Sequence, residues 1–244
     1  MSDSGSVSEP GRSHHPLPGR AGAGEDAAPR ARRAAIAELG DALRDLVGQA
    51  SATEVPGDVL RQVAAQVREA ATVLGRRTRT RSELPGADDL AGGFRMYNPV
   101  TGHGSALAPP LHIEVAGQAV VGTCTLGLAF EGPPGFAHGG VSAMLLDQLL
   151  GYAASAAGHP GMTVRLETSY RAPVPLQAPL RLTAEVSEVD GRRVTARGVI
   201  ATAAEPGTAL VEAVGGFVAL RPEQAARMFG GIRPDATDPL VAHD

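Results

Sequence analysis

The residues best suited to chemistry stand at the start of one apolar segment. His138, Gly139 and Gly140 precede the run Val141–Ala157, in which Asp147 is the only carboxylate. A poorly solvated carboxylate can act as a general base or as a nucleophile. The first N–H groups of a helix are unpaired and lie at the positive end of its dipole, so they can stabilise an oxyanion. The pattern therefore predicts attack on a carbonyl that is polarised at the start of a helix.

Each of these residues also has an ordinary structural interpretation. Asp147 could reach the rim of the helix or pair with an arginine, and His138 could be a simple cap-region residue. The apolar run nevertheless favours burial of Asp147, although burying a lone carboxylate is costly. Glycines at positions 139 and 140 would let a carbonyl approach the backbone closely. His138 could then orient this turn or the carbonyl itself.

Periodicity predicts the elements that position these residues. The run Val141–Ala157 is too long for a strand and too short to span a membrane, which favours a helix buried on most sides. Alternating apolar residues predict strands near 111–115, 120–130, 163–171, 180–189, 192–203 and 209–220. Asp190-Gly191 is a strong hairpin signal. The order β-β-α-β-β-β predicts an α+β fold in which one antiparallel sheet wraps around one helix.

The segment FEGPPGFAHGGVSAMLLDQLLG combines His-Gly-Gly with an aspartate nine residues after the histidine, and Thr163 follows on the next strand. The later stretch LETSYRAP places a Tyr-x-x-Pro pattern at the end of that strand. Together these motifs resemble the PaaI-like hotdog-fold thioesterases, the family that includes the THEM4-type acyl-CoA thioesterases. The resemblance covers roughly residues 108 to 221 and does not extend to the N-terminal part of the chain.

This resemblance implies a hotdog fold and the hydrolysis of an acyl-CoA thioester to free acid and CoA. It implies that Asp147 activates a water or attacks the thioester directly. The N–H of Gly139, with that of Gly140, would polarise the carbonyl, His138 would help to hold it, and Thr163 would position the water. It also implies a homodimer or homotetramer with active sites at the dimer interface, where Asp147 would serve a partner subunit's glycine turn.

The phosphates of CoA need cations near the mouth of such a site. Arg165 and Arg171 are the main candidates for substrate binding, and Arg181, Arg192 and Arg193 are further ones, although each could also be a plain surface charge. A second basic cluster consists of Arg76, Arg77, Arg79 and Arg81. It could touch a CoA phosphate or a nucleic acid, or it could simply suit the C-terminus of a helix.

Two other classes of function are considered for this sequence, a binding module and a regulator. The main rival is a non-catalytic module that binds acyl-CoA or an acyl carrier, and a third class is a regulator whose N-terminal helices contact DNA. The net charge of −4 offers no global basic field for nucleic acid. Cys124, the only cysteine, suggests a small core residue rather than a nucleophile, and no metal or cofactor is expected. A single cysteine and the lack of a secretory signal fit a cytoplasmic location.

The predicted organisation follows from composition. Residues 1–28 are rich in Gly, Ser, Pro and Ala and predict a disordered tail. A helical extension is expected over 29–82, with amphipathic helices at 29–50 and 56–77 whose apolar faces pack against something. A loop-rich linker over 83–107, the hotdog domain over 108–222 and a C-terminal tail over 223–244 complete the chain.

Overall fold

The computed structural model describes residues 27–88, 95–109, 111–116 and 119–229. The predicted N-terminal tail thus lies almost entirely outside the described residues, and so does most of the predicted C-terminal tail. The part of the C-terminal region that is described contains a short helix, α4 (Pro222–Phe229).

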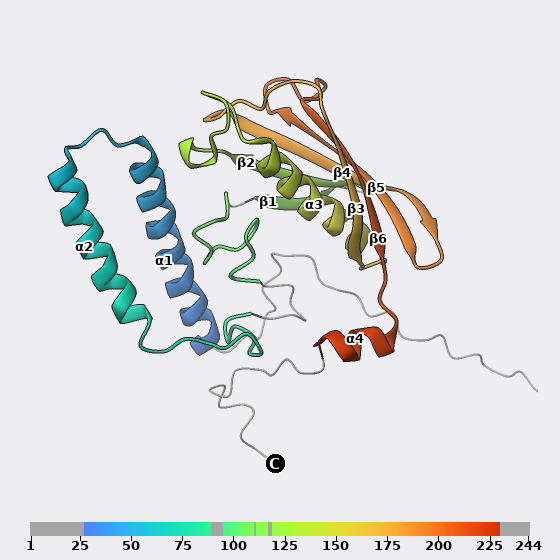
Figure 1. Cartoon of the computed structure of the whole chain (residues 1–244). Helices are drawn as coiled ribbons and strands as arrows, with labels where there is room; N and C mark the ends of the chain where they lie inside the picture. Colours follow the sequence, from blue (N-terminus) through green and yellow to red (C-terminus); the bar gives the residue numbers. More distant parts are fainter. Residues whose placement is uncertain (1–26, 89–94, 110, 117–118, 230–244) are drawn as a thin grey trace, which may run out of the picture.

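A six-stranded antiparallel sheet curves around one central helix, α3 (Gly139–Ala156), as Figure 1 shows. The strand order across the sheet is β1-β2-β4-β5-β6-β3, so β1 and β3 form its two edges. The strands are β1 (His112–Ala116), β2 (Ala119–Thr125), β3 (Met162–Tyr170), β4 (Pro179–Asp190), β5 (Arg193–Thr202) and β6 (Val211–Val218). This is the hotdog fold, in which all six predicted apolar runs form strands. The predicted order β-β-α-β-β-β is one strand short, because four strands rather than three follow α3.

The central helix is buried along one face rather than on most sides, which corrects the expectation from its apolar sequence. Its buried residues recur at helical spacing: Ser142, Leu145, Leu146, Leu149, Leu150, Ala153 and Ala154. They pack into the concave face of the sheet together with core residues such as Leu182, Ile200 and Phe217. On the other face, Met144, Asp147 and Gln148 are only half-buried. The helix therefore presents a second face that the sheet does not cover.

The strand predicted over 120–130 is too long, because β2 ends at Thr125 and Leu128–Phe130 forms a 3-10 turn. A loop held by backbone bonds then returns to α3. The His138 N–H donates to the Phe130 carbonyl at 2.9 Å, and the Ala137 N–H donates to the Val174 carbonyl at 2.8 Å. The sequence prediction missed this turn, because Leu126, Leu128 and Phe130 keep the alternating spacing of a strand up to residue 130. The turn matters because it sets the direction in which α3 begins.

The N-terminal extension consists of α1 (Ala27–Ala52) and α2 (Gly57–Leu74). The two helices stand beside the hotdog domain in Figure 1. Along α2 no residue is buried, and its apolar residues Val59, Leu60, Val63 and Val67 are exposed. The expectation that both helices use their apolar faces is therefore not met by α2 within this chain, whereas α1 does pack against other segments.

Residues 95–109, here called the strap, join the extension to the hotdog domain. All but the last two belong to the predicted linker over 83–107, yet Met96 and Val100 are buried there, and Ala108 is buried just beyond it. Arg44 of α1 donates from Nη1 to the carbonyls of His103 and Ser105, both at 2.8 Å. The strap is therefore a packed segment and not a loose connection.

Gly40 marks the closest approach of α1 to the strap. A Cβ built on Gly40 would lie 2.0 Å from the His103 carbonyl oxygen, whereas one built on Gly48 would meet nothing within 4 Å. Both glycines lie inside the same helix, and neither has a positive φ.

We predict opposite effects of alanine at these two positions. Alanine in a helix interior gains up to about 1 kcal/mol over glycine, so Gly48→Ala should raise the melting temperature slightly. Gly40→Ala should lower it, because overpacking against backbone costs about 1–3 kcal/mol and outweighs the gain in propensity. Thermal unfolding monitored by circular dichroism measures both. Equal stabilisation by the two variants would contradict the close contact between α1 and the strap.

Candidate active site

The N-terminus of α3 is capped by a side chain. His138 is the N-cap residue, and its Nδ1 accepts the Gly140 N–H at 3.0 Å. An Nδ1 that accepts leaves the ring proton on Nε2. The cap therefore fixes the orientation of the His138 ring and presents Nε2 as a donor. It also occupies the Gly140 N–H, so the second glycine that the sequence suggested as a carbonyl donor is already bonded.

Gly139, the first residue of α3, keeps its N–H available. None of the described residues accepts a hydrogen bond from this N–H. The Gly139 carbonyl accepts the Tyr170 hydroxyl at 2.9 Å. A Cβ on Gly139 would lie 3.3 Å from the Tyr170 ring, so the tyrosine closely borders this backbone. Tyr170 was not among the predicted site residues, although it belongs to the Tyr-x-x-Pro motif.

Asp147 and Thr163 come together on the half-exposed side of α3. The Thr163 hydroxyl donates to Asp147 Oδ1 at 3.0 Å. Sixteen residues separate the two positions, and the contact joins the third turn of the helix to the start of β3. Asp147 is half-buried within this chain, which corrects the expectation of full burial. Among the described residues, no group donates a hydrogen bond to the other carboxylate oxygen, Oδ2.

A β-bulge in β3 makes this contact geometrically feasible. The pairing with β6 shifts between Thr163 and Arg165. Thr163 pairs with Phe217 and Leu166 pairs with Gly215, so both lie on the face of the sheet that packs against α3. In a regular strand, residues three apart point to opposite faces. Only the extra residue at the bulge lets Thr163 and Leu166 face the helix together, and bulges recur beside active sites.

The two halves of the candidate site are far apart within one chain. Eight residues of helix separate Gly139 from Asp147, which corresponds to about 12 Å along the axis. A single carbonyl would have to lie within about 3 Å of the attacking group and of the oxyanion donor. The short side chain of Asp147 does not bridge this gap. One chain therefore places the attacking group and the donor in two separate places along α3.

Both halves lie beside an open sheet edge. β3 is the terminal strand of the sheet, and all its residues except Leu166 and Thr168 are exposed. Val164, at the bulge, is 63% exposed. An edge strand of this kind carries unpaired N–H and C=O groups that can pair with another strand. The site therefore lies on a surface that the chain itself leaves uncovered.

The arginines predicted to bind substrate are engaged with carboxylates. Arg165 forms an ion pair with Glu167 on the same strand. Arg171 donates from Nε and Nη2 to a Glu212 carboxylate oxygen at 2.9 and 2.8 Å. Arg192 donates to the Ala219 carbonyl at 2.8 Å. Neutralising partners reduce the attraction of Arg165 and Arg171 for phosphate.

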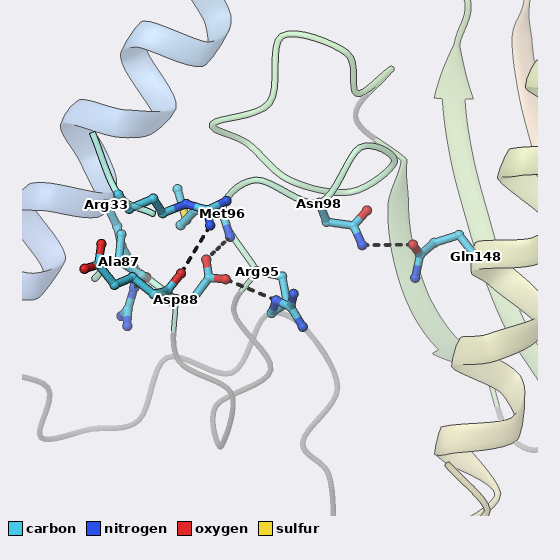
Figure 2. Close-up of polar contacts among 9 residues, drawn as sticks. Arg33, Ala87, Asp88, Arg95, Met96, Asn98 and Gln148 are labelled. Atoms are coloured by element: carbon cyan, nitrogen blue, oxygen red, sulfur yellow. Dashed lines mark hydrogen bonds and ion pairs between the residues drawn. The ribbon is translucent and has the colours of Figure 1, made fainter. Parts of the chain in front are cut away.

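A further polar contact next to Asp147 was not foreseen. Gln148 Oε1 accepts from the Asn98 side-chain amide at 2.9 Å, as drawn in Figure 2. The Asn98 side-chain oxygen accepts the N–H groups of Val100 and Thr101 at 2.8 and 3.0 Å. The strap is thus hydrogen-bonded to α3 at Gln148, the residue that follows Asp147. No short-range pattern in the sequence links positions 98 and 148.

Comparison with known proteins places the chain in a family. A model of the thioesterase superfamily matches residues 134–205, the segment that contains α3 and β3. A solved crystal structure of a thioesterase superfamily protein is 37% identical, covers 75% of this chain and 94% of its own, and has a TM-score of 0.65. The chain belongs to the thioesterase superfamily. The predicted resemblance is confirmed at this level.

The solved relative extends beyond the hotdog domain. Residues 108–222 make up less than half of the 244, so a match over 75% of the chain extends beyond the hotdog domain.

Curated relatives are named acyl-coenzyme A thioesterase THEM4. The mouse protein is 33% identical over 98 residues, which cover 40% of this chain and 42% of the relative. The Xenopus laevis protein is 38% identical over 64 residues, or 26% and 29% of the two chains. The chain thus spans less than half of the length of the curated relatives that it matches.

No described helix combines the length and the apolar character that crossing a membrane requires. Within the same residues, no three His, Cys, Asp or Glu side chains gather where they could hold a metal ion.

Cys124 lies in β2 and is directly paired with Leu180 of β4. Burial raises the pKa of its thiol from 9.0 to about 12. A thiol needs its thiolate form to act as a nucleophile, so this residue is unsuited to the chemistry of the site.

We predict that Cys124 resists alkylation in the native protein. The shift in pKa lowers the thiolate fraction near pH 8 by about 10³-fold relative to an unperturbed thiol. Labelling with a maleimide at pH 8 should therefore be slow in buffer and as fast as free cysteine in denaturant. Native labelling at the rate of free cysteine would contradict the burial.

Proposed function

We propose that this member of the thioesterase superfamily hydrolyses an acyl-CoA thioester to the free acid and CoA. The observation that carries the proposal is the Thr163–Asp147 hydrogen bond on a half-exposed helix face that begins with an available Gly139 N–H. The names of the curated relatives, acyl-coenzyme A thioesterase, support the choice of substrate class.

In the proposed reaction Asp147 acts as general base. Thr163 donates to Oδ1, which orients the carboxylate and leaves Oδ2 for a water. Asp147 takes a proton from that water while the water oxygen bonds to the thioester carbon. The tetrahedral oxyanion then collapses, the C–S bond breaks, and the thiolate of CoA leaves and takes up a proton. General-base catalysis of this kind contributes about 10²–10⁴-fold to a rate.

The carbonyl oxygen would be held at the N-terminus of α3. The Gly139 N–H is the available donor there, and the helix dipole adds positive potential. The His138 ring, fixed by its bond to the Gly140 N–H, can donate from Nε2 to the same oxygen. Tyr170 holds the Gly139 carbonyl and so keeps this turn in place.

The complete site would be assembled by two chains. Pairing of two β3 edges in antiparallel sense places two α3 helices side by side in opposite directions. Asp147 of one protomer would then approach the Gly139 turn of its partner, which resolves the separation of about 12 Å within a chain. The half-exposed apolar face of α3 and the exposed residues of β3 support this arrangement.

We predict that Asp147→Asn lowers kcat by about 10²-fold or more with a smaller effect on KM. The amide preserves the shape of the side chain and its contact with Thr163 but cannot accept a proton from water. The measurement is steady-state hydrolysis across a panel of acyl-CoAs of different chain length and of aryl-CoAs.

Asp190→Asn, in the exposed β4–β5 hairpin, is the matched control and should leave kcat unchanged. Wild-type activity in Asp147→Asn would refute the role of Asp147. Binding of CoA esters by the wild type without any hydrolysis would instead favour a non-catalytic acyl-CoA binding module.

We predict that two inactive variants restore each other if the site is shared between chains. Gly139→Pro removes the proposed donor at the first helical position, where proline is tolerated. Co-expression of Gly139→Pro with Asp147→Asn should give about a quarter of wild-type activity, since half of the dimers are mixed and each has one intact site. Two affinity tags allow the mixed dimer to be purified and assayed. Inactive mixed dimers would place the whole site within one chain.

A further inference from the structure

The N-terminal extension contains a cleft that the proposed reaction does not use. It has a volume of about 720 Å³ and lies between the start of α1, the segment that follows α2, and the beginning of the strap. Its lining includes Arg32, Arg77, Arg79, Glu83 and Tyr97. Ligand-binding pockets commonly have volumes of about 300–1,000 Å³, so this cleft could hold a small molecule.

The charge of the cleft favours an anion. Three arginines line it, and Glu83 is the only carboxylate among the lining residues. The Glu83 side chain is already bonded to the Thr80 N–H at 2.8 Å, and its carbonyl accepts Arg79 Nη1 at 3.2 Å. No ion pair with a carboxylate is found for Arg32, Arg77 or Arg79 in the described part of the chain. A local positive charge thus stands out on a chain whose net charge is −4.

The cleft also has an aromatic and apolar lining against which the flat ring of a ligand could pack. Tyr97 is 45% exposed, and Ile36, Pro85 and Ala87 add apolar surface. Aromatic side chains stack on nucleobases, and guanidinium groups bind phosphate oxygens in pairs. The combination of three arginines with an exposed tyrosine is therefore suited to a phosphorylated nucleotide rather than to a simple anion.

A network of contacts connects this cleft to the candidate active site. Arg33 Nε donates to the Ala87 carbonyl at 2.8 Å, and Asp88 accepts from Arg95 and from the Met96 N–H at 3.1 and 2.8 Å. Tyr97 follows in the lining of the cleft, and the next residue, Asn98, bonds to α3 beside Asp147. Figure 2 shows these contacts running from α1 along the strap to α3.

We propose that the cleft binds the phosphorylated adenosine portion of the CoA thioester. This inference rests on the proposed function, because CoA carries a 3′-phosphate, a diphosphate and an adenine at the end of its pantetheine arm. The arm separates the nucleotide from the reacting carbonyl, so the two ends need separate sites. The arginines near the catalytic helix, Arg165 and Arg171, are neutralised by carboxylates, whereas those of the cleft are not.

The test removes the three arginines together, as Arg32→Ala/Arg77→Ala/Arg79→Ala in the full-length chain. Calorimetry measures binding of adenosine 3′,5′-bisphosphate, and steady-state kinetics compare an acyl-CoA with the N-acetylcysteamine thioester of the same acyl group. The variant should raise both the Kd for the bisphosphate and the KM for acyl-CoA by about 10-fold or more. Hydrolysis of the short thioester, which has no nucleotide, should be unchanged.

A matched variant controls for the loss of charge. Arg61→Ala/Arg68→Ala/Arg197→Ala removes three exposed arginines that do not line the cleft, and it should leave both constants unchanged. Tyr97→Ala should weaken bisphosphate binding without altering the charge. Circular dichroism spectra that match the wild type would establish that each variant is folded.

The remaining outcomes separate the two proposals. Unchanged Kd and unchanged KM in the triple variant would overturn the nucleotide site. Weaker bisphosphate binding with an unchanged KM would overturn the link to the substrate and assign the cleft to a free nucleotide. If the wild type hydrolyses neither thioester, the proposed function fails, while calorimetry with the bisphosphate still decides whether the cleft binds nucleotides.

Discussion

The structure depends on the fact that α3 is apolar on nearly all sides but is covered by its own sheet on only one. Leucines fill the buried face, whereas Met144, Asp147 and Gln148 lie on a face that remains half-exposed. A helix with so little polar surface needs a second cover. The strap supplies part of it through the Asn98–Gln148 bond. The side facing the edge strand β3 is left open.

The polar groups of the site gather along this open side. Thr163 reaches Asp147 from the bulge in β3, and Tyr170 reaches the Gly139 carbonyl from the other end of the same strand. A single strand thus contacts both the start and the middle of the helix. If a partner chain covers this side, bulk water is excluded from the carboxylate and the helix N-terminus, apart from the one water that the proposed reaction consumes. Electrostatic interactions are stronger in such an environment, which is where an oxyanion needs stabilising.

The N-terminal extension is connected to the same helix by a chain of specific contacts. Arg44 of α1 bonds to the strap, Arg33 bonds to Ala87 in the segment that follows α2, and the absence of a side chain at Gly40 lets α1 and the strap touch. The strap then contacts α3 beside Asp147. Changes in the extension can therefore alter the position of the proposed base. Within the described part of the chain, the apolar residues of α2 stay exposed.

The sequence by itself indicated the helices and strands, and it pointed to the two chemical groups of the candidate site, the Asp147 carboxylate and the Gly139 N–H. Apolar spacing of 3.6 and 2 residues, the Asp190-Gly191 turn and the His138-Gly139-Gly140 start are local signals, and the helix, the hairpin and the antiparallel strands followed from them. Only the tertiary structure decided which helix face is buried, which residues the β3 bulge turns inward, and which arginines are paired. These depend on contacts between residues far apart in the sequence, such as Asn98 with Gln148, that no local periodicity encodes.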